Sequence, residues 1–247
     1  MKIRKLFLVC AIAMVFIVNS ISAQVFRVSA FSQEGVIMGD ITKKEINNKA
    51  AGYVDYGSSG GLEVNYFLKN NLGFGLRFAA TNYGRDFETY ESDLTEMLEI
   101  TDDQYDMTQT YSFWSFGPDL GISYLIGLSK KLQLEPCFFF GFKGLISPYS
   151  NVIYSQDNIT YQYRTKPKTY VGFSYSPGVK LNWNIVKHFG LFFSLEYEGN
   201  SFVSDDERSI LYNYRTLEII EREKTYTINS LNFGFGMAFR FGKGLDQ

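Results

Sequence analysis

The side chains with the most obvious potential for nucleophilic or acid–base catalysis are His188, the only histidine of the 247 residues, and Cys137. A serine or cysteine nucleophile needs a base beside it and a third group that orients the base. His188 lies in a predicted tight turn, whereas Cys137 lies within a predicted strand. We therefore expect no Ser-His-acid or Cys-His site, and we expect Cys137 to fill space.

Carboxylates are concentrated in residues 83–107, where the hydrophobic pattern is irregular and Arg85 is the only basic residue. A cluster of this kind could bind divalent cations or face a basic partner. The acidic residues are Asp86, Glu88, Glu91, Asp93, Glu96, Glu99, Asp102, Asp103 and Asp106.

The spacing of these carboxylates is not that of a calcium-binding loop. Residues 102–106 lack the turn glycine and the distal glutamate that such a loop requires. Leu94, Met97 and Leu98 are at helical spacing, so residues 92–100 could form a helical turn or two. The sequence therefore predicts a long, exposed and solvated acidic loop.

Other chemistry is not indicated. The sequence has no HExxH motif, no phosphate-binding glycine loop and no group of ligands at metal-binding spacing, so we expect no metal and no cofactor. The formal net charge is −2, and there is no basic patch of the kind that nucleic acid requires.

Residues 1–23 resemble a targeting segment. Lys2, Arg4 and Lys5 precede an apolar core over residues 6–18, and cleavage after Ala23 is expected. The core is too short for a membrane-spanning helix. Removal of this segment takes away three basic and no acidic residues, so the formal charge changes from −2 to −5. One cysteine then remains, and an internal disulfide cannot form in the exported chain.

The remaining chain, residues 24–247, reads as one domain of β-strands. In residues 225–241, every second position from Leu231 to Phe241 is large and apolar, and the positions between are Asn, Gly, Gly, Ala and Arg. A period of two is the pattern of a strand with two different faces. Similar strands are predicted at residues 25–31, 60–68, 72–81, 109–126, 132–143, 169–183 and 191–198.

Periodicity alone does not show which face is inside. A soluble sandwich or lipocalin-like barrel would bury the large residues and leave glycine and alanine facing water, where longer polar residues usually lie. Small residues instead fit the crowded interior of a narrow barrel. The length of the last strand also matches the roughly 9–11 residues that a tilted strand needs to cross a bilayer. We therefore predict that the large apolar face meets lipid.

The connections alternate between short and long. Short turns are predicted at residues 69–71, 127–131 and 184–188, and longer polar connections at residues 33–57, 83–107, 147–168 and 201–224. Parts of the last connection could extend the flanking strands. This asymmetry is typical of outer-membrane barrels, with short periplasmic turns and long extracellular loops. The predicted fold is an all-β, eight-stranded, antiparallel up-and-down transmembrane barrel.

If the apolar face meets lipid, the opposite face fills the lumen. An eight-stranded barrel is only wide enough for side chains, so the charges predict an ion-paired plug. A narrow polar conduit for ions or protons is the alternative. Trp114, Tyr124 and Trp183 lie near strand ends, as interfacial aromatics do. The five basic and five acidic lumen residues are Arg27, Glu63, Arg77, Asp119, Glu135, Lys143, Lys180, Glu196, Glu198 and Arg240.

The glycine-aromatic strands NLGFGLRF (residues 71–78) and LNFGFGMAFRF (residues 231–241), with the targeting segment ending ISAQ, carry a family resemblance. The chain resembles small outer-membrane β-barrels of the OmpX and OmpA-transmembrane type, and more closely the PorT-like barrel proteins of Bacteroidota. The resemblance covers residues 24–247 as a pattern and contains no specific motif. Many such barrels end on a phenylalanine, whereas this chain continues beyond Phe241.

The resemblance implies a bacterial outer-membrane location and contact with outer-membrane lipid, with a protein partner at the extracellular loops or the periplasmic turns. Lipid A deacylases and palmitoyltransferases of similar size use a histidine near the outer surface, whereas His188 is expected on the periplasmic side. We therefore predict a non-enzymatic surface-interaction protein with a plugged lumen. Two alternatives are a narrow porin-like channel for ions or small solutes and an accessory component of a protein secretion apparatus.

Overall fold

The structure, a computed structural model, describes residues 25–46, 51–100, 105–109, 112–156, 159–213 and 217–242. The predicted targeting segment, residues 1–23, lies outside these ranges, as do Asp102 and Asp103.

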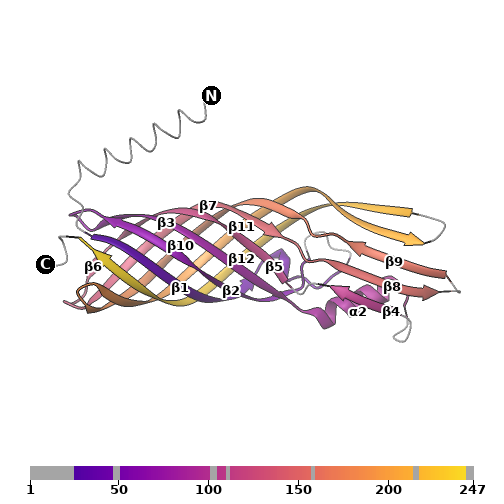
Figure 1. The fold of residues 1–247 in the computed structure, drawn as a ribbon, viewed down its shortest axis with the longest axis horizontal. Coiled ribbons are helices and arrows are strands. Elements are labelled where there is room, and N and C mark those ends of the chain that lie inside the picture. The colour runs from indigo at the N-terminus through magenta and orange to yellow at the C-terminus, as the bar shows by residue number, and fades with distance from the viewer. Residues whose placement is uncertain are drawn as a thin grey trace, which may run out of the picture.

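Eight antiparallel strands form a closed barrel (Figure 1). Each strand pairs with the next barrel strand along the chain, and the last strand pairs with the first, so Phe26 lies opposite Phe241. Closure leaves the barrel without an unpaired edge. The predicted fold class is confirmed. The barrel strands are β1 (Val25–Met38), β2 (Val54–Phe67), β3 (Leu72–Arg85), β5 (Ser112–Tyr124), β7 (Leu132–Ile146), β10 (Thr169–Val186), β11 (Phe189–Asn213) and β12 (Leu217–Phe241).

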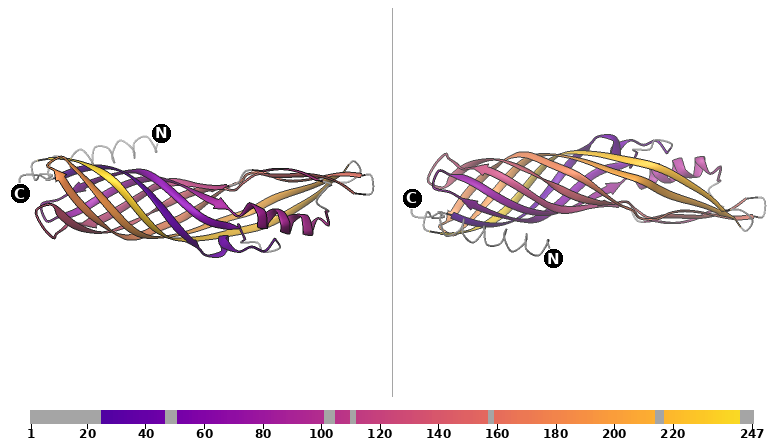
Figure 2. Two further views of the ribbon diagram at one scale, coloured as in Figure 1. Left: turned by 90° about the horizontal axis from the view of Figure 1, so that it is seen from below. Right: turned by 90° about the horizontal axis from the view of Figure 1, so that it is seen from above.

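The large apolar side chains point outward and the small or polar ones inward, as predicted. Along β5, buried and exposed residues alternate without interruption from Phe113 to Tyr124. On the outer surface, Phe142 is 67% exposed and Phe235 is 65% exposed. The strands are tilted relative to the barrel axis (Figure 2), as closure of a sheet into a barrel requires.

The polar region predicted for residues 33–57 is shorter than expected. β1 continues to Met38, a short 3-10 helix, η1 (Asp40–Thr42), follows, and β2 already begins at Val54. Gln33 pairs with Ser59 and Glu34 with Ser58 in the same register as the residues before them. The prediction failed because backbone pairing in a closed sheet does not require apolar side chains.

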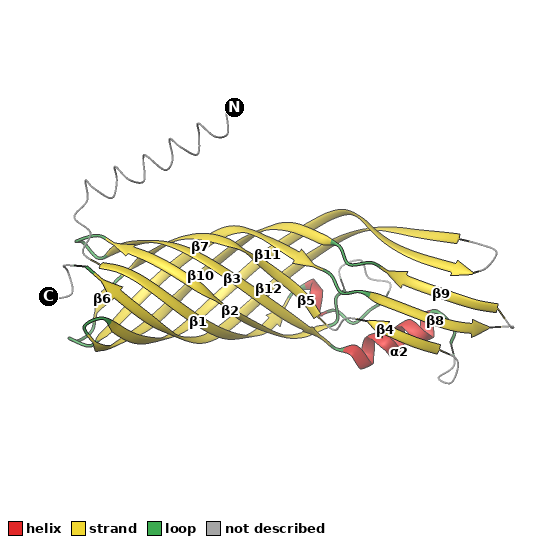
Figure 3. Ribbon diagram, in the orientation of Figure 1, coloured by secondary structure: helices red, strands yellow, loops and turns green. Residues whose placement is uncertain are grey.

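The long connections form a folded extension, the head, at the end of the barrel away from the start of β1 and the end of β12 (Figure 3). Residues 147–168 contain a hairpin of β8 (Ser150–Gln156) and β9 (Ile159–Thr165), and β4 (Tyr105–Gln109) pairs with β8. β11 and β12 continue past the barrel and pair as far as Tyr212 and Leu217, and β11 also pairs with β9. The predicted extension of the strands flanking the last connection is confirmed, and the connection over residues 147–168 also contains strands.

The predicted acidic loop is largely helical. Helix α2 (Phe87–Met97) begins with Asp86, whose side chain accepts a hydrogen bond from the Thr89 N–H. An aspartate at this position satisfies one of the first free N–H groups of a helix. The helix therefore begins before residue 92, the start predicted from the helical spacing of Leu94 and Met97. No helix within the described ranges is long and apolar enough to cross a membrane.

At the end opposite the head, the strands are joined by short turns. β6 (Ile126–Gly127) adds a brief pairing with β7 next to one of them. His188 lies in another, between β10 and β11. The length asymmetry predicted for the connections is therefore present, with the long extensions and the tight turns at opposite ends.

Candidate functional site

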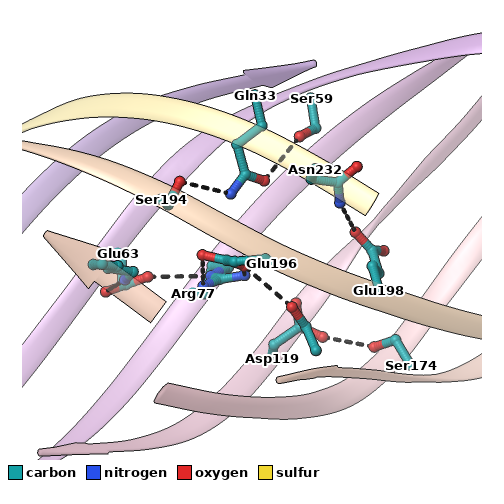
Figure 4. A network of polar contacts seen from close by, with 12 residues as sticks. Gln33, Ser59, Glu63, Arg77, Asp119, Ser174, Ser194, Glu196, Glu198 and Asn232 are labelled. Carbon is teal, nitrogen blue, oxygen red and sulfur yellow. Dashed lines mark hydrogen bonds and ion pairs between the residues drawn. The ribbon is translucent and has the colours of Figure 1, made fainter. Parts of the chain in front are cut away.

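Arg77 on β3 lies at the centre of the barrel interior (Figure 4). Its guanidinium donates two hydrogen bonds to Glu196, at 2.7 and 3.1 Å, and one to Glu63, at 3.1 Å. The Phe139 ring lies 3.7 Å from the guanidinium carbon and the Phe31 ring 5.4 Å from it. Bidentate pairing with stacking on a ring is the geometry that suits arginine better than lysine.

A second group lies nearer the short turns. Arg27 donates to both carboxylate oxygens of Glu135 at 2.6 Å, and Asn182 donates to the same carboxylate at 2.8 Å. Lys180 forms an ion pair with Glu63, which also lies 3.6 Å from Arg27. Glu63 thus joins this group to Arg77.

A third group lies nearer the head. Lys143 forms an ion pair with Glu198, and it lies 3.8 Å from Asp119. Asp119 also accepts a hydrogen bond from Ser174 at 2.7 Å, and Asn200 donates to Glu198 at 2.9 Å. These buried charges therefore have ionic or hydrogen-bonding partners, which burial in a narrow lumen requires.

The structure places nine of the ten predicted lumen charges in these groups, and Arg240 is the exception. Arg240 lies at the mouth with the short turns, and it donates to the carbonyl oxygen of Val186 at 3.4 Å. Among the described residues, it forms no ion pair with a carboxylate. The equal count of five basic and five acidic residues is therefore corrected: four basic and five acidic side chains meet in the interior.

Aromatic rings also lie inside the barrel, which the alternation did not predict. Phe139 is 1% exposed and Phe192 is 3% exposed, although large residues were predicted to face lipid. Gly121 gives Phe139 room, because a Cβ at this glycine would lie 2.9 Å from the ring carbon Cγ. The signal was present in the consecutive residues Phe138, Phe139 and Phe140, because alternation forces one of three neighbours inward.

Above the ionic groups, the lumen is filled by a layer of apolar side chains. Ile41, from the 3-10 helix between β1 and β2, is fully buried in this layer. The aromatic rings within it meet edge to face, as Tyr170 and Tyr226 do at 5.2 Å between ring centroids. The layer consists of Ile37, Ile41, Val54, Tyr83, Phe113, Leu145, Tyr170, Phe202, Tyr226 and Ile228.

The head has a small core of its own. Tyr90 and Leu94 of α2 pack with Val152 and Tyr154 of β8 and with Tyr53, which immediately precedes β2. Burial and the hydrogen bond to Asp93 raise the pKa of Tyr53. The head is therefore a packed unit and not a solvated loop.

The acidic residues of the head divide into two sets. Asp86 accepts from Lys44 at 2.6 Å, Glu91 from the Tyr105 hydroxyl at 2.8 Å and Asp93 from the Tyr53 hydroxyl at 2.6 Å. These contacts hold the head together. Hydrogen bonds from Lys44 and Thr89 lower the pKa of Asp86 to about 2.

The other set faces solvent. It contains Glu88 and Glu96 on one side of α2, Glu99 beyond the helix end and Asp106 on β4. In the part of the chain that the structure describes, no three His, Cys, Asp or Glu side chains are arranged to hold a metal ion.

His188 and Cys137, the two candidate catalytic residues, lie in different parts of the barrel. The Nδ1 atom of His188 lies 2.9 Å from the carbonyl oxygen of Arg240, at the end of the barrel away from the head. Cys137 is buried inside the barrel. A Ser-His-acid site at the head could therefore not include this histidine.

The mouth with the short turns contains a basic cavity of about 430 Å³. Its charged lining residues are Arg27, Lys130, Lys131, Lys187 and Arg240, and none is acidic. The charged residues that line the cavity are thus all basic, whereas the head exposes carboxylates as well as basic side chains such as Lys43 and Lys44.

A closed antiparallel barrel with phenylalanines outside and paired ions inside satisfies the conditions for spanning a bilayer with strands. Trp114, Tyr124 and Trp183 are about half exposed on its outer surface, where interfacial aromatics belong. The protein is a small, eight-stranded β-barrel of the bacterial outer membrane.

No family model and no curated protein matches the chain. Among solved structures, it is similar to Ail of Yersinia pestis at 13% identity and TM-score 0.41, over 90% of this chain and 100% of that one. OprG of Pseudomonas aeruginosa aligns at 13% identity and TM-score 0.44, over 90% and 98%. The Escherichia coli outer membrane protein W aligns at 12% identity and TM-score 0.44, over 89% and 99%. Similarities this low transfer no residue role to this chain.

Proposed function

We propose that the protein is a non-enzymatic outer-membrane barrel that displays a folded acidic head for interaction at the cell surface. The observation that carries the proposal is the head itself, in which β9, β8 and β4 continue the sheet from the extended β11 and α2 packs against Val152 and Tyr154 of β8. Its core is stabilised by hydrogen bonds such as Tyr53 to Asp93. A packed head presents one fixed surface, so binding costs less ordering entropy than it would for a flexible loop.

The filled lumen supports this function over a channel. An ion would have to displace paired charges and then pass the apolar layer around Ile41. We expect purified protein in planar bilayers to give no steady conductance. Steady single-channel currents would refute the plugged lumen.

The exposed carboxylates of the head favour a basic partner. In nanodiscs, the full chain should bind a lysine-rich peptide with an affinity that falls as salt rises. The triple variant Glu88→Gln, Glu96→Gln and Glu99→Gln should lose most of this binding, because these side chains face solvent. Charge removal at Lys130, Lys131 and Lys187 of the opposite mouth is the matched control. Equal binding by both variants would contradict a role of the head.

A role as an accessory of protein secretion, as in the PorT-like family that the chain resembles, is the second candidate. The observation that favours it is the basic mouth, which is suited to an acidic periplasmic partner. A stoichiometric complex isolated from native membranes, and lost on substitution of Lys130, Lys131 and Lys187 by Gln, would support it. Isolation of the barrel without any partner would count against it.

A further inference from the structure

Glu34 is an anomaly on the outer surface of the barrel. It is exposed on β1, on the side that carries Phe26 and Val36. Asp55, at the irregular start of β2, is also charged and exposed, but it forms an ion pair with Lys44 at 3.0 Å, whereas no described residue forms an ion pair with Glu34. An ionisable residue that faces lipid is costly, and it usually marks a functional contact.

The neighbours of Glu34 are also unusual. In the barrel register, Glu34 lies beside Ser58, which lies beside Asn82. One step nearer the short turns, Ser32 lies beside Gly60, which lies beside Ala80. We call these six residues of β1, β2 and β3 the polar patch.

Large apolar residues border the polar patch on every side. Glu34 and Ser32 lie opposite Phe233 and Phe235 of β12. On the other side, the same two rungs continue from Asn82 and Ala80 to Trp114 and Phe116 of β5. Leu62, which is 60% exposed, lies on the next rung toward the short turns. The polar patch is thus a small area of polar and small side chains bordered by large apolar side chains on the outer surface of the barrel.

A hollow of about 230 Å³ lies beside the patch, lined by Glu34, Ser32, Phe193, Phe233 and Phe235 among others. It leaves the Glu34 carboxylate open to approach from outside the barrel. No hydrogen bond or ion pair reaches that carboxylate from any residue that the structure describes. The carboxylate is therefore available to accept a hydrogen bond from another molecule.

The arrangement of the patch favours a second copy of the chain. Gly60 and Ala80 at its centre and edge allow two surfaces to approach closely, as small residues do in membrane interfaces. Two copies inserted in the same direction can form a closed pair only around an axis parallel to the membrane normal. Such an axis brings the β1 edge of one patch against the β3 edge of the other.

We propose that the polar patch is the contact between two copies of this chain, related by a two-fold axis that passes close to Ser58. In this dimer, the Glu34 carboxylate of each copy accepts a hydrogen bond from the Asn82 amide of the other. The patch is self-complementary, with an acceptor on β1, a donor on β3 and small residues between them. Lipid chains offer no donor to Glu34, whereas a second copy offers its Asn82 amide, and the two-fold axis makes two such contacts in the dimer.

Cysteine crosslinking in native outer membranes tests the proposal. The full chain carries Cys137→Ala, which removes the only other cysteine expected in the exported protein, together with Ser58→Cys. A short bismaleimide should link this variant into a dimer. Leu120→Cys, at an exposed lipid-facing position of β5, is the matched control and should stay monomeric.

Glu34→Leu added to Ser58→Cys should lower the crosslinked fraction by about tenfold, because membrane hydrogen bonds contribute on this scale and the dimer has two. Glu34→Gln retains an acceptor and should keep most of the crosslinking. Since leucine suits a lipid-facing site, Glu34→Leu should fold normally, which the change of gel mobility on heating confirms. Crosslinking of Ser58→Cys no better than Leu120→Cys, crosslinking only to a different protein, or no effect of Glu34→Leu would each overturn the proposal.

Discussion

Replacement of Arg77 by methionine tests whether the ionic groups stabilise the barrel as a connected unit. Arg77 is 4% exposed and donates three hydrogen bonds to two buried carboxylates. At about 3 Å and an effective dielectric constant near 20, each charge pair contributes roughly 5 kcal/mol of attraction before desolvation is subtracted. In this variant, methionine should fill much of the volume of the arginine side chain and keep a contact with the Phe139 ring.

The two carboxylates respond differently to the loss of Arg77. Glu63 keeps Lys180 and Arg27 nearby. Glu196 keeps only a hydrogen bond from Ser176, at 3.1 Å, among its described contacts. A buried carboxylate that loses its cation typically costs about 3 to 5 kcal/mol, so we expect Arg77→Met to destabilise the barrel by that amount.

The assay is urea unfolding of the refolded barrel in lipid vesicles, followed by the gel mobility of unheated samples. Adding Glu196→Gln should restore about 2 kcal/mol, because the unpaired charge is then absent. Arg240→Met is the control and should cost less than about 1 kcal/mol, because that arginine pairs with no described carboxylate. The reasoning fails if Arg77→Met behaves like Arg240→Met, or if Glu196→Gln makes the variant worse.

Three further substitutions test the faces of the barrel and the head. Phe235→Lys places a charge in lipid and should cost about 2 to 4 kcal/mol in the same unfolding assay, and wild-type stability would mean that this face is not in lipid. Gly236→Trp should prevent refolding, since even a Cβ at this position would lie 2.6 Å from the Phe192 ring carbon Cε1, and normal refolding would contradict a packed lumen. Asp86→Ala should raise protease cleavage in the head, with a loss of about 0.5 to 2 kcal/mol of local stability, whereas Glu88→Ala should not. Because the pKa of Asp86 is lowered to about 2, its contribution is complete above the unfolded value near 4 and lost as pH falls toward 2, so the two variants should differ at pH 6 and converge at pH 2.

Much of the barrel could be predicted from the sequence because its strands obey a local rule. In a closed sheet between lipid and a narrow lumen, each side chain faces either the lipid or the lumen. The alternation of Phe233, Gly234 and Phe235 indicates which side each of these residues faces. The number of strands, the inward direction of most charged residues and the length asymmetry of the connections follow from this alternation. They require no knowledge of which strand contacts which.

The tertiary structure decided the contacts that depend on distant positions. The pairing of Arg77 with Glu196 joins residues 119 positions apart, and no local pattern specifies it. Arg240 is not part of the ionic groups because it lies at the mouth of the barrel. The Phe139 side chain points inward because Gly121 leaves space for its ring. Helix α2 and the burial of Ile41 likewise depend on surfaces contributed by other segments. Alternation shows which side of a strand a residue occupies, whereas its partners are set by the closure and register of the whole barrel.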